Sequence, residues 1–233
     1  MQKWSKSSDQ PLEIRFLLFD RFSNLCLANC LEPMRAANDF AGQPVFHWRF
    51  LTPANAPEIC TLDCGTMNFS EADYVMTNTP GMLTAMGRMI TELGVKPEVE
   101  AFDTGHLWYA KQLVADGVLE PNVLVQLCMG VPWGAPDDLN TFMAMVNNVP
   151  NNWTFSAFSL GRNQMAYVAA AVLAGGNVRV GLEDNLWLEK GVLATNEQLV
   201  SRAKTVIENM GARVIGPKEV RQKLSLTKHA PRG

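Results

Sequence analysis

The feature that most constrains the fold is a regular alternation of short apolar segments with helical segments along almost the whole chain. Strands are expected at residues 13–20, 45–52, 59–65, 97–103, 122–130, 153–161 and 177–184. Helices are expected between and after them, at 24–42, 81–94, 106–117, 137–147, 163–176, 196–211 and 217–224. Strands that alternate with helices of about a dozen residues are typical of parallel βα units. The pattern therefore predicts an α/β fold with a parallel sheet.

The number of strands favours one architecture. Seven strands are more than a small doubly wound domain uses and one fewer than the closed (β/α)8 barrel has. We predict a parallel, TIM-barrel-like (β/α) fold of about seven strands, incomplete or chimeric. The carboxyl ends of the strands in such a barrel meet at one mouth, where the chemistry is placed.

Polar side chains follow four of the expected strands. They are Thr66 and Asn68, Asp103 and His106, Arg162 and Gln164, and Glu183 and Asp184. The most informative stretch is "NVRVGLEDN" at 177–185, where apolar residues alternate with Arg179, Gly181 and Glu183. Charged side chains on the inner face of a strand are costly unless they are paired. Arg179, Glu183 and Asp184 are therefore candidate functional residues.

The composition excludes several classes of partner. The formal net charge of −3 leaves no basic surplus for a phosphate backbone, so we expect no nucleic-acid partner. No apolar run approaches the ~20 residues of a membrane span, and the polar start "MQKWSKSSDQ" is unlike a signal peptide. Five cysteines indicate free thiols in a reducing compartment. We expect a cytoplasmic protein.

Some polar residues keep two interpretations at this point. His106 follows "EAFDTG" and is either structural or catalytic, whereas His47, between aromatic residues, is interpreted as a packed side chain. Arg162 and Gln164 follow a strand, where they either meet a phosphate or carboxylate or serve the fold alone. Trp108 and Trp133 would suit a cationic head group through cation–π contact.

Five stretches carry a family resemblance. They are "CTLDCGTMNF", "KPEVEAFDTGHLWYA", "NVLVQLCMGVPWGAPDDL", "FSLGRNQM" and "GGNVRVGLEDNLWLEKG". In their order and spacing, residues from about 57 to 228 resemble the β-keto acid cleavage enzymes, the family that includes 3-keto-5-aminohexanoate cleavage enzyme. The resemblance implies a zinc-dependent TIM barrel. It further implies cleavage of a β-keto acid with acetyl-CoA as co-substrate, which gives acetoacetate and a new acyl-CoA.

The resemblance also implies roles for individual residues. Glu183 looks like the metal-ligand carboxylate and Asp184 like the general base. Arg179 looks like the guanidinium that positions that base and the keto acid, with Glu100 as the acid that supports it. The candidate substrate-binding residues are Thr66, Asn68, Arg162 and Gln164.

The first part of the chain resembles something else. The stretch "FLLFDRFSNLCLANCLEPMRAAND", within residues 12–53, resembles the start of the amidotransferase-like domain of AraC-type regulators. We therefore expect a β-α-β unit at 1–56 and the C-terminal part of a cleavage-enzyme barrel at 57–233. The join at 53–58 is expected to be an exposed loop.

The metal site is expected to be incomplete. The family's His-x-His motif is absent, because the histidines are His47, His106 and His229 alone. We therefore expect weak or no zinc binding. The predicted function is metal-dependent C–C cleavage and acyl transfer on a β-keto acid. The alternative is a metabolite-binding protein or an inactive fusion. Because a barrel short of a strand leaves an unpaired edge, we also expect a homo-oligomer.

Overall fold

The structure is a computed structural model that describes residues 12–17, 46–51, 57–69 and 73–227, the first two ranges by their backbone only. The chain divides into two units, which are considered separately: residues 1–56 with 229–233, and Pro57–Lys228. In the first unit, β1 (Leu12–Leu17) pairs in parallel with β2 (Phe46–Leu51). The predicted helix at 24–42, the side chain of His47 and most of the predicted join at 53–58 lie outside the described residues.

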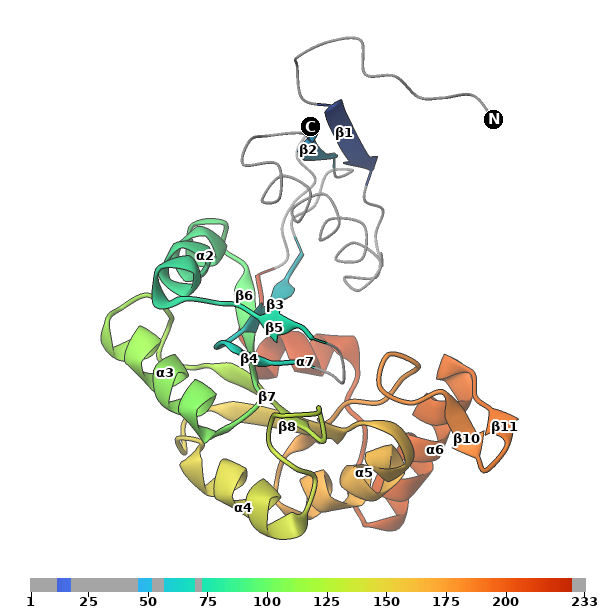
Figure 1. The fold of residues 1–233 in the computed structure, drawn as a ribbon. Coiled ribbons are helices and arrows are strands. Elements are labelled where there is room, and N and C mark those ends of the chain that lie inside the picture. The colour runs from blue at the N-terminus through green and yellow to red at the C-terminus, as the bar shows by residue number, and fades with distance from the viewer. Residues whose placement is uncertain (1–11, 18–45, 52–56, 70–72, 228–233) are drawn as a thin grey trace, which may run out of the picture. The chain divides into compact units, whose positions relative to one another are not determined.

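The second unit is built on a parallel sheet of five strands in chain order (Figure 1). The strands are β3 (Ile59–Asp63), β6 (Lys96–Ala101), β7 (Leu124–Met129), β8 (Thr154–Ser159) and β9 (Asn177–Val178). The predicted α/β class, parallel pairing and strand order are confirmed. Five of the seven predicted strands form this sheet, and the other two pair with each other in the first unit.

Helices separate and follow the strands of the sheet, and four of them begin where a polar side chain caps them. They are α2 (Pro80–Glu92), α3 (Thr104–Ala115), α4 (Leu139–Asn148), α5 (Gln164–Leu173), α6 (Asn196–Asn209) and α7 (Pro217–Lys223). The side chains of Thr79, Asp103, Asp138 and Thr195 each accept a backbone N–H of the following first turn. These caps explain why α2, α3, α4 and α6 start within a few residues of the predicted positions.

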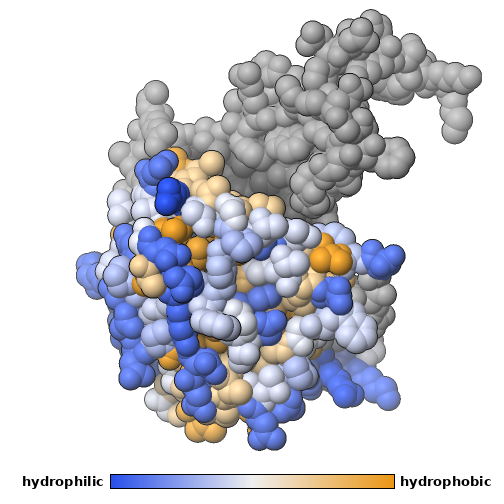
Figure 2. Space-filling model, turned by 60° about the vertical axis from the view of Figure 1, so that its left-hand side comes forward, coloured by the Kyte–Doolittle hydropathy of each residue, from blue (hydrophilic) through white to orange (hydrophobic). Residues whose placement is uncertain are grey.

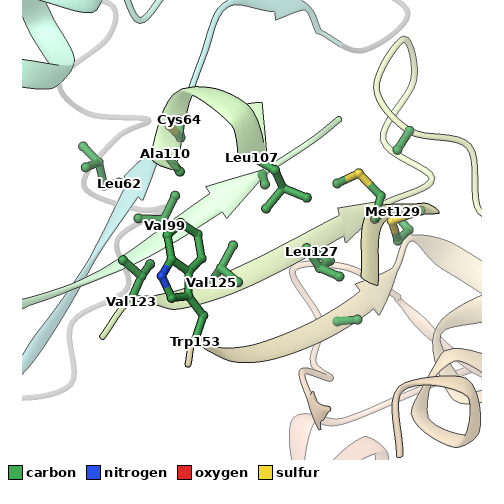
Figure 3. Close-up of a cluster of buried hydrophobic side chains, with 14 of the residues drawn as sticks. Leu62, Cys64, Val99, Leu107, Ala110, Val123, Val125, Leu127, Met129 and Trp153 are labelled. Carbon is green, nitrogen blue, oxygen red and sulfur yellow. The ribbon is translucent and has the colours of Figure 1, made fainter. Parts of the chain in front are cut away.

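The core lies between the sheet and its helices. Val99, Val125 and Leu127 point to this side, where they pack with residues such as Leu107 of α3 (Figure 3). Because side chains alternate along a strand, the even-numbered residues of β6, β7 and β8 point to the opposite, inner face. That face carries polar side chains, including Glu98, Glu100, Gln126 and Ser156. The sheet is therefore apolar toward the helices and largely polar on its inner face.

The seventh predicted strand is much shorter than expected. The prediction covered residues 177–184, but β9 ends at Val178. Beyond Arg179 the chain turns: the Leu182 N–H bonds to Asn196 Oδ1, and the Asp184 N–H bonds to the Gly181 carbonyl. This turn brings Asp184 back beside Arg179.

Two short antiparallel hairpins were not predicted. β4 (Met67–Asn68) pairs with β5 (Val75–Met76), and β10 (Trp187–Glu189) pairs with β11 (Val192–Leu193). Strands of two or three residues are too short to produce a recognisable alternation in the sequence.

On the face that Figure 2 shows, the second unit mixes hydrophilic residues with small apolar patches. Within the described part of the chain, no helix combines the length and the apolar character that crossing a membrane requires.

Candidate functional site

The side chain of Arg179 is the centre of a network of ion pairs on the inner face of the sheet. Its Nε and Nη2 donate to Oδ2 and Oδ1 of Asp184, both at 2.9 Å. Its Nη1 donates to Oε1 of Glu100 at 2.9 Å, and Nη2 lies 3.3 Å from Oε2 of Glu183. The guanidinium carbon lies 4.3 Å from the centre of the Phe158 ring. The planar fork is thus fixed on three sides and stacked on an aromatic ring.

The guanidinium of Arg179 stays protonated. Burial by itself would lower the pKa of Arg179, but the hydrogen bonds and charge of Asp184, with the charges of Glu100 and Glu183, outweigh burial. The pKa of Arg179 therefore lies above its ordinary value, and the group stays a cation throughout the physiological range.

Asp184 is a buried carboxylate that is held at both oxygens. Its side chain is 3% exposed, and its carbonyl accepts the N–H of Gly161 at 2.7 Å. Burial raises the pKa of Asp184, and Arg179 opposes that rise. A carboxylate with raised proton affinity and a fixed orientation has the properties of a general base.

Glu100 lies on the other side of Arg179 and next to a second acid. Its side chain is 12% exposed, and Asp63 of β3 is its direct partner in the β3–β6 register. Burial and the nearby charge of Asp63 raise the pKa of Glu100 to about 8, although Arg179 acts in the opposite direction. Burial also raises the pKa of Asp63. The inner face thus holds two adjacent carboxyl groups beside one guanidinium.

The four candidate substrate-binding residues do not join this network. Thr66 and Asn68 are exposed at the β4 hairpin, and Oγ1 of Thr66 accepts the Asn78 N–H at 2.9 Å. Arg162 lies in a single 3-10 turn, Gly161–Asn163. Gln164 is fully buried, and its Nε2 donates to the Gly181 carbonyl at 3.1 Å, which supports the turn that returns Asp184 to Arg179.

His106 has the geometry of a structural residue. Its ring packs against Gly65, where an added Cβ would lie 2.2 Å from Cδ2 of the ring. Its Nδ1 accepts the Phe102 N–H at 3.3 Å, and its Nε2 lies 3.7 Å from Oδ2 of Asp103. Both ring nitrogens therefore face groups of its own strand end and helix.

The described residues do not fit a zinc site. Catalytic zinc requires three protein ligands, usually including imidazoles, at about 2 Å. Among the residues that the structure describes, no group of three or more His, Cys, Asp or Glu side chains is placed to hold a metal ion. Glu183, the candidate metal ligand, is 56% exposed and lies against Arg179.

The reasoning from sequence missed two acids, Asp63 at the end of β3 and Asp137 just before the N-cap of α4. Asp63 faces Glu100, and its place at the end of the predicted strand 59–65 was the available signal. Asp137 accepts hydrogen bonds from Ser159 Oγ at 2.7 Å and Asn163 Nδ2 at 2.6 Å. The hydrogen bond from Asn163 lowers the pKa of Asp137, and the hydrogen bond from Ser159 lowers it further by a smaller amount. Asp137 therefore ties together the segments that follow β7 and β8.

A cavity of about 630 Å³ lies beside the ion-pair network. Its polar wall is the inner face of the sheet, with Glu98, Gln126, Ser156 and Arg179. Its apolar wall comes from α6, α7 and the segment between them, including Ile207. Arg179 therefore borders both this cavity and the carboxylates at the strand ends.

Comparisons with known proteins agree on one family. A family model described as "beta-keto acid cleavage enzyme" matches residues 36–226, so the match begins before residue 57. A 3-dehydrocarnitine:acetyl-CoA trimethylamine transferase of Rhizobium meliloti (strain 1021) is 76% identical over 172 residues, 74% of this chain and 57% of that protein. A 3-keto-5-aminohexanoate cleavage enzyme of Fusobacterium nucleatum is 38% identical over 173 residues, 74% of this chain and 62% of that protein. This chain thus spans about three fifths of these curated relatives.

A solved structure shows the same fold. A binary complex of ObcA with oxaloacetate superposes with a TM-score of 0.59 at 22% identity, covering 73% of this chain and 46% of that one. At this identity the likeness concerns the fold alone. It confirms the expected α/β, TIM-barrel-like class.

Proposed function

This chain belongs to the β-keto acid cleavage enzyme family, and from that premise we propose that it cleaves a C–C bond of a β-keto acid and transfers an acyl group with acetyl-CoA. The products would be acetoacetate and a new acyl-CoA. The observation that carries the proposal is the two-point contact between Arg179 and the buried Asp184, which prepares a carboxylate for proton transfer.

The proposed substrate carries a cationic nitrogen. The relative with 76% identity is named for 3-dehydrocarnitine and trimethylamine, and that identity extends over three quarters of this chain. Trp108 of α3 and Trp133 in the loop after β7 are both exposed, and aromatic faces attract quaternary ammonium groups.

The residues of this chain would act on protons and charge. Asp184 would accept a proton from the carbon next to the keto group, while Arg179 keeps the two oxygens of Asp184 oriented. Arg179 would also stabilise negative charge that develops on the keto oxygen. A zinc ion would polarise that oxygen in a complete member of the family. We propose no zinc-dependent step here, because the described residues do not fit the ion.

A second candidate function is binding of the same metabolite without turnover, as a sensor or an inactive fusion. The lack of a metal-binding group among the described side chains favours it. In this case the Arg179 network would hold the carboxylate of a keto acid rather than activate it.

Turnover distinguishes the two candidates. We expect the full chain, given 3-dehydrocarnitine and acetyl-CoA, to form acetoacetate far more slowly than the Rhizobium meliloti relative does, because a step that needs a Lewis acid is slowed. The measurement is acetoacetate formed per chain per minute. Asp184→Asn should lower the rate of the unmodified chain by a further factor of about 10²–10⁴. Asp116→Asn, at an exposed helix end, should leave that rate unchanged. No acetoacetate, together with a rise in melting temperature on adding 3-dehydrocarnitine, would support the binding function instead.

Elemental analysis tests the metal. We expect the purified chain to hold much less than one zinc ion per chain, and we expect Glu183→Ala to leave that content unchanged. The reason is that a single exposed carboxylate holds zinc weakly in water. One tightly held zinc per chain that is lost in Glu183→Ala would contradict this account of the site.

Self-association and location also belong to the proposal. Among the described strands, β3 and β9 are the two edges of the five-stranded sheet. Exposed edges recruit further chains, so we propose a homo-oligomer. A cytoplasmic location remains a prediction from the sequence.

A further inference from the structure

More acids than bases lie on the inner face of the sheet. Glu98, Glu100, Asp63 and Asp184 are close enough to Arg179 or to one another to alter each other's ionisation. Arg179 is the one guanidinium that contacts this group among the described residues. Four carboxylates against one guanidinium would bury a large net negative charge, which is costly. Protons are the simplest way to remove part of that charge.

The positions of Asp63 and Glu100 show where a proton fits. The two residues are direct partners across β3 and β6, so their side chains emerge side by side on the same face. Burial raises the pKa of Asp63, and a hydrogen bond from Glu100 acts against that rise. A hydrogen bond between two carboxyl groups requires that one of them carries a proton, because ionised carboxylates only accept.

Among the neighbouring groups, Arg179 opposes a proton on Glu100, whereas the surrounding acids favour it. The Nη1 of Arg179 donates a hydrogen bond to Oε1 of Glu100, and the thiol sulfur of Cys128 lies 3.8 Å from Oε2 of Glu100. Burial raises the pKa of that thiol, so it remains neutral. The other titratable groups that face the pair are Glu98 on β6, His106 on α3, and Glu183 beyond β9.

We infer that Asp63 and Glu100 share one proton near neutral pH, and that Asp63 is thereby a positioning residue that keeps Arg179 committed to Asp184. When the pair is singly protonated, less negative charge competes with Asp184 for the guanidinium. Arg179 then keeps both oxygens of Asp184 oriented as the proposed proton acceptor. The shared proton is independent of the proposed function; only this last consequence rests on it.

Titration of side-chain carboxyl groups by NMR tests the inference on the full chain without any substrate. With glutamate labelled by ¹³C at the side-chain carboxyl, one resonance is expected to titrate near pH 8, the value to which burial and Asp63 raise the pKa of Glu100. Glu100→Gln should remove this resonance. Asp63→Asn should move its midpoint to lower pH, because the like charge beside Glu100 is gone. Asp116→Asn, on the exposed end of α3, is the matched control and should leave the midpoint unchanged.

Two results would overturn the inference: every glutamate of the unmodified chain titrating in the acidic range, or an unchanged Glu100 midpoint in Asp63→Asn. If Asp63→Asn does not fold, the reciprocal measurement uses labelled aspartate, and Glu100→Ala should then raise the midpoint of Asp63, because the hydrogen bond from Glu100 that lowers the pKa of Asp63 is gone. Where cleavage is measurable, Asp63→Asn should also move the alkaline limb of kcat to lower pH, which a purely structural role would not do. Because the titration needs no turnover, a lack of cleavage activity would leave its result standing.

Discussion

Arg179→Ala is expected to lower the free energy of unfolding by about 3–5 kcal/mol, the largest effect of any single substitution at the site. The loss arises because Asp184, whose side chain is 3% exposed, would lose the cation that compensates its burial, and because Glu100, whose side chain is 12% exposed, would lose the hydrogen bond from Arg179. Urea-induced unfolding at neutral pH, with the midpoint and the slope reported separately, measures the effect.

Two further variants separate charge from packing. Arg179→Met keeps an aliphatic side chain over the Phe158 ring, so it should recover the packing part of the loss and none of the ion-pair part. Arg213→Ala removes a guanidinium that also contacts one carboxylate through two hydrogen bonds, but on the surface, where the stability should hardly change. Equal and small effects for Arg179→Ala and Arg213→Ala would mean that the network contributes little to the fold.

The stability of the fold is expected to decrease as the pH rises toward 8. Burial and Asp63 raise the pKa of Glu100 from 4.5 to about 8 in the folded chain. Between these two values the folded state keeps a proton that the unfolded state has released. The proton on Glu100 therefore makes the free energy of unfolding fall with increasing pH, by at most about 1.4 kcal/mol per pH unit for this one proton, and its effect levels off above the folded pKa. Burial also raises the pKa of Asp63, Glu98 and Asp184, so they act in the same direction.

Unfolding curves in urea from about pH 5 to about pH 9 measure this dependence. Glu100→Gln carries no titrating group at that position, so its stability should change less over the same range. The comparison concerns slopes rather than absolute values, because this substitution also removes the ion pair to Arg179. Asp137, with its lowered pKa, affects only the acidic end, where stability is lost as the pH falls through that pKa. A stability that stays constant or rises from pH 5 to pH 8 would contradict the assignment of a protonated Glu100.

The sequence alone was sufficient for the parallel α/β sheet of the second unit. Apolar segments such as 122–130 and 153–161 indicate strands, and capping residues such as Asp103 and Asp138 stand where helices begin. Hydrophobic periodicity and capping depend on neighbours within a few residues. The alternation of strands and helices was also enough to predict the strand order along residues 59–183, since consecutive βα units usually pack side by side.

The sequence also showed that Arg179, Glu183 and Asp184 required an explanation, because a charged stretch at a strand end is visible as a local pattern. Their geometry was not visible. The alternation predicted a strand through residue 184, whereas β9 ends at Val178 and the chain then turns. This turn places the carboxylate of Asp184 against the guanidinium of Arg179. Hydrogen bonds from Gln164 and Asn196 hold that turn, and such bonds between distant segments leave no periodic trace.

The tertiary structure alone decided which acids meet. Asp63 and Glu100 lie on separate strands, and their adjacency depends on the register of β3 against β6. Burial raises the pKa of both groups, the charge of Asp63 raises that of Glu100 further, and a hydrogen bond from Glu100 lowers that of Asp63; all of these depend on the assembled sheet. The sequence determined the elements because they are set by local interactions. Only the structure determined the charge state of the site, because electrostatic energies depend on distances and burial that no local pattern encodes.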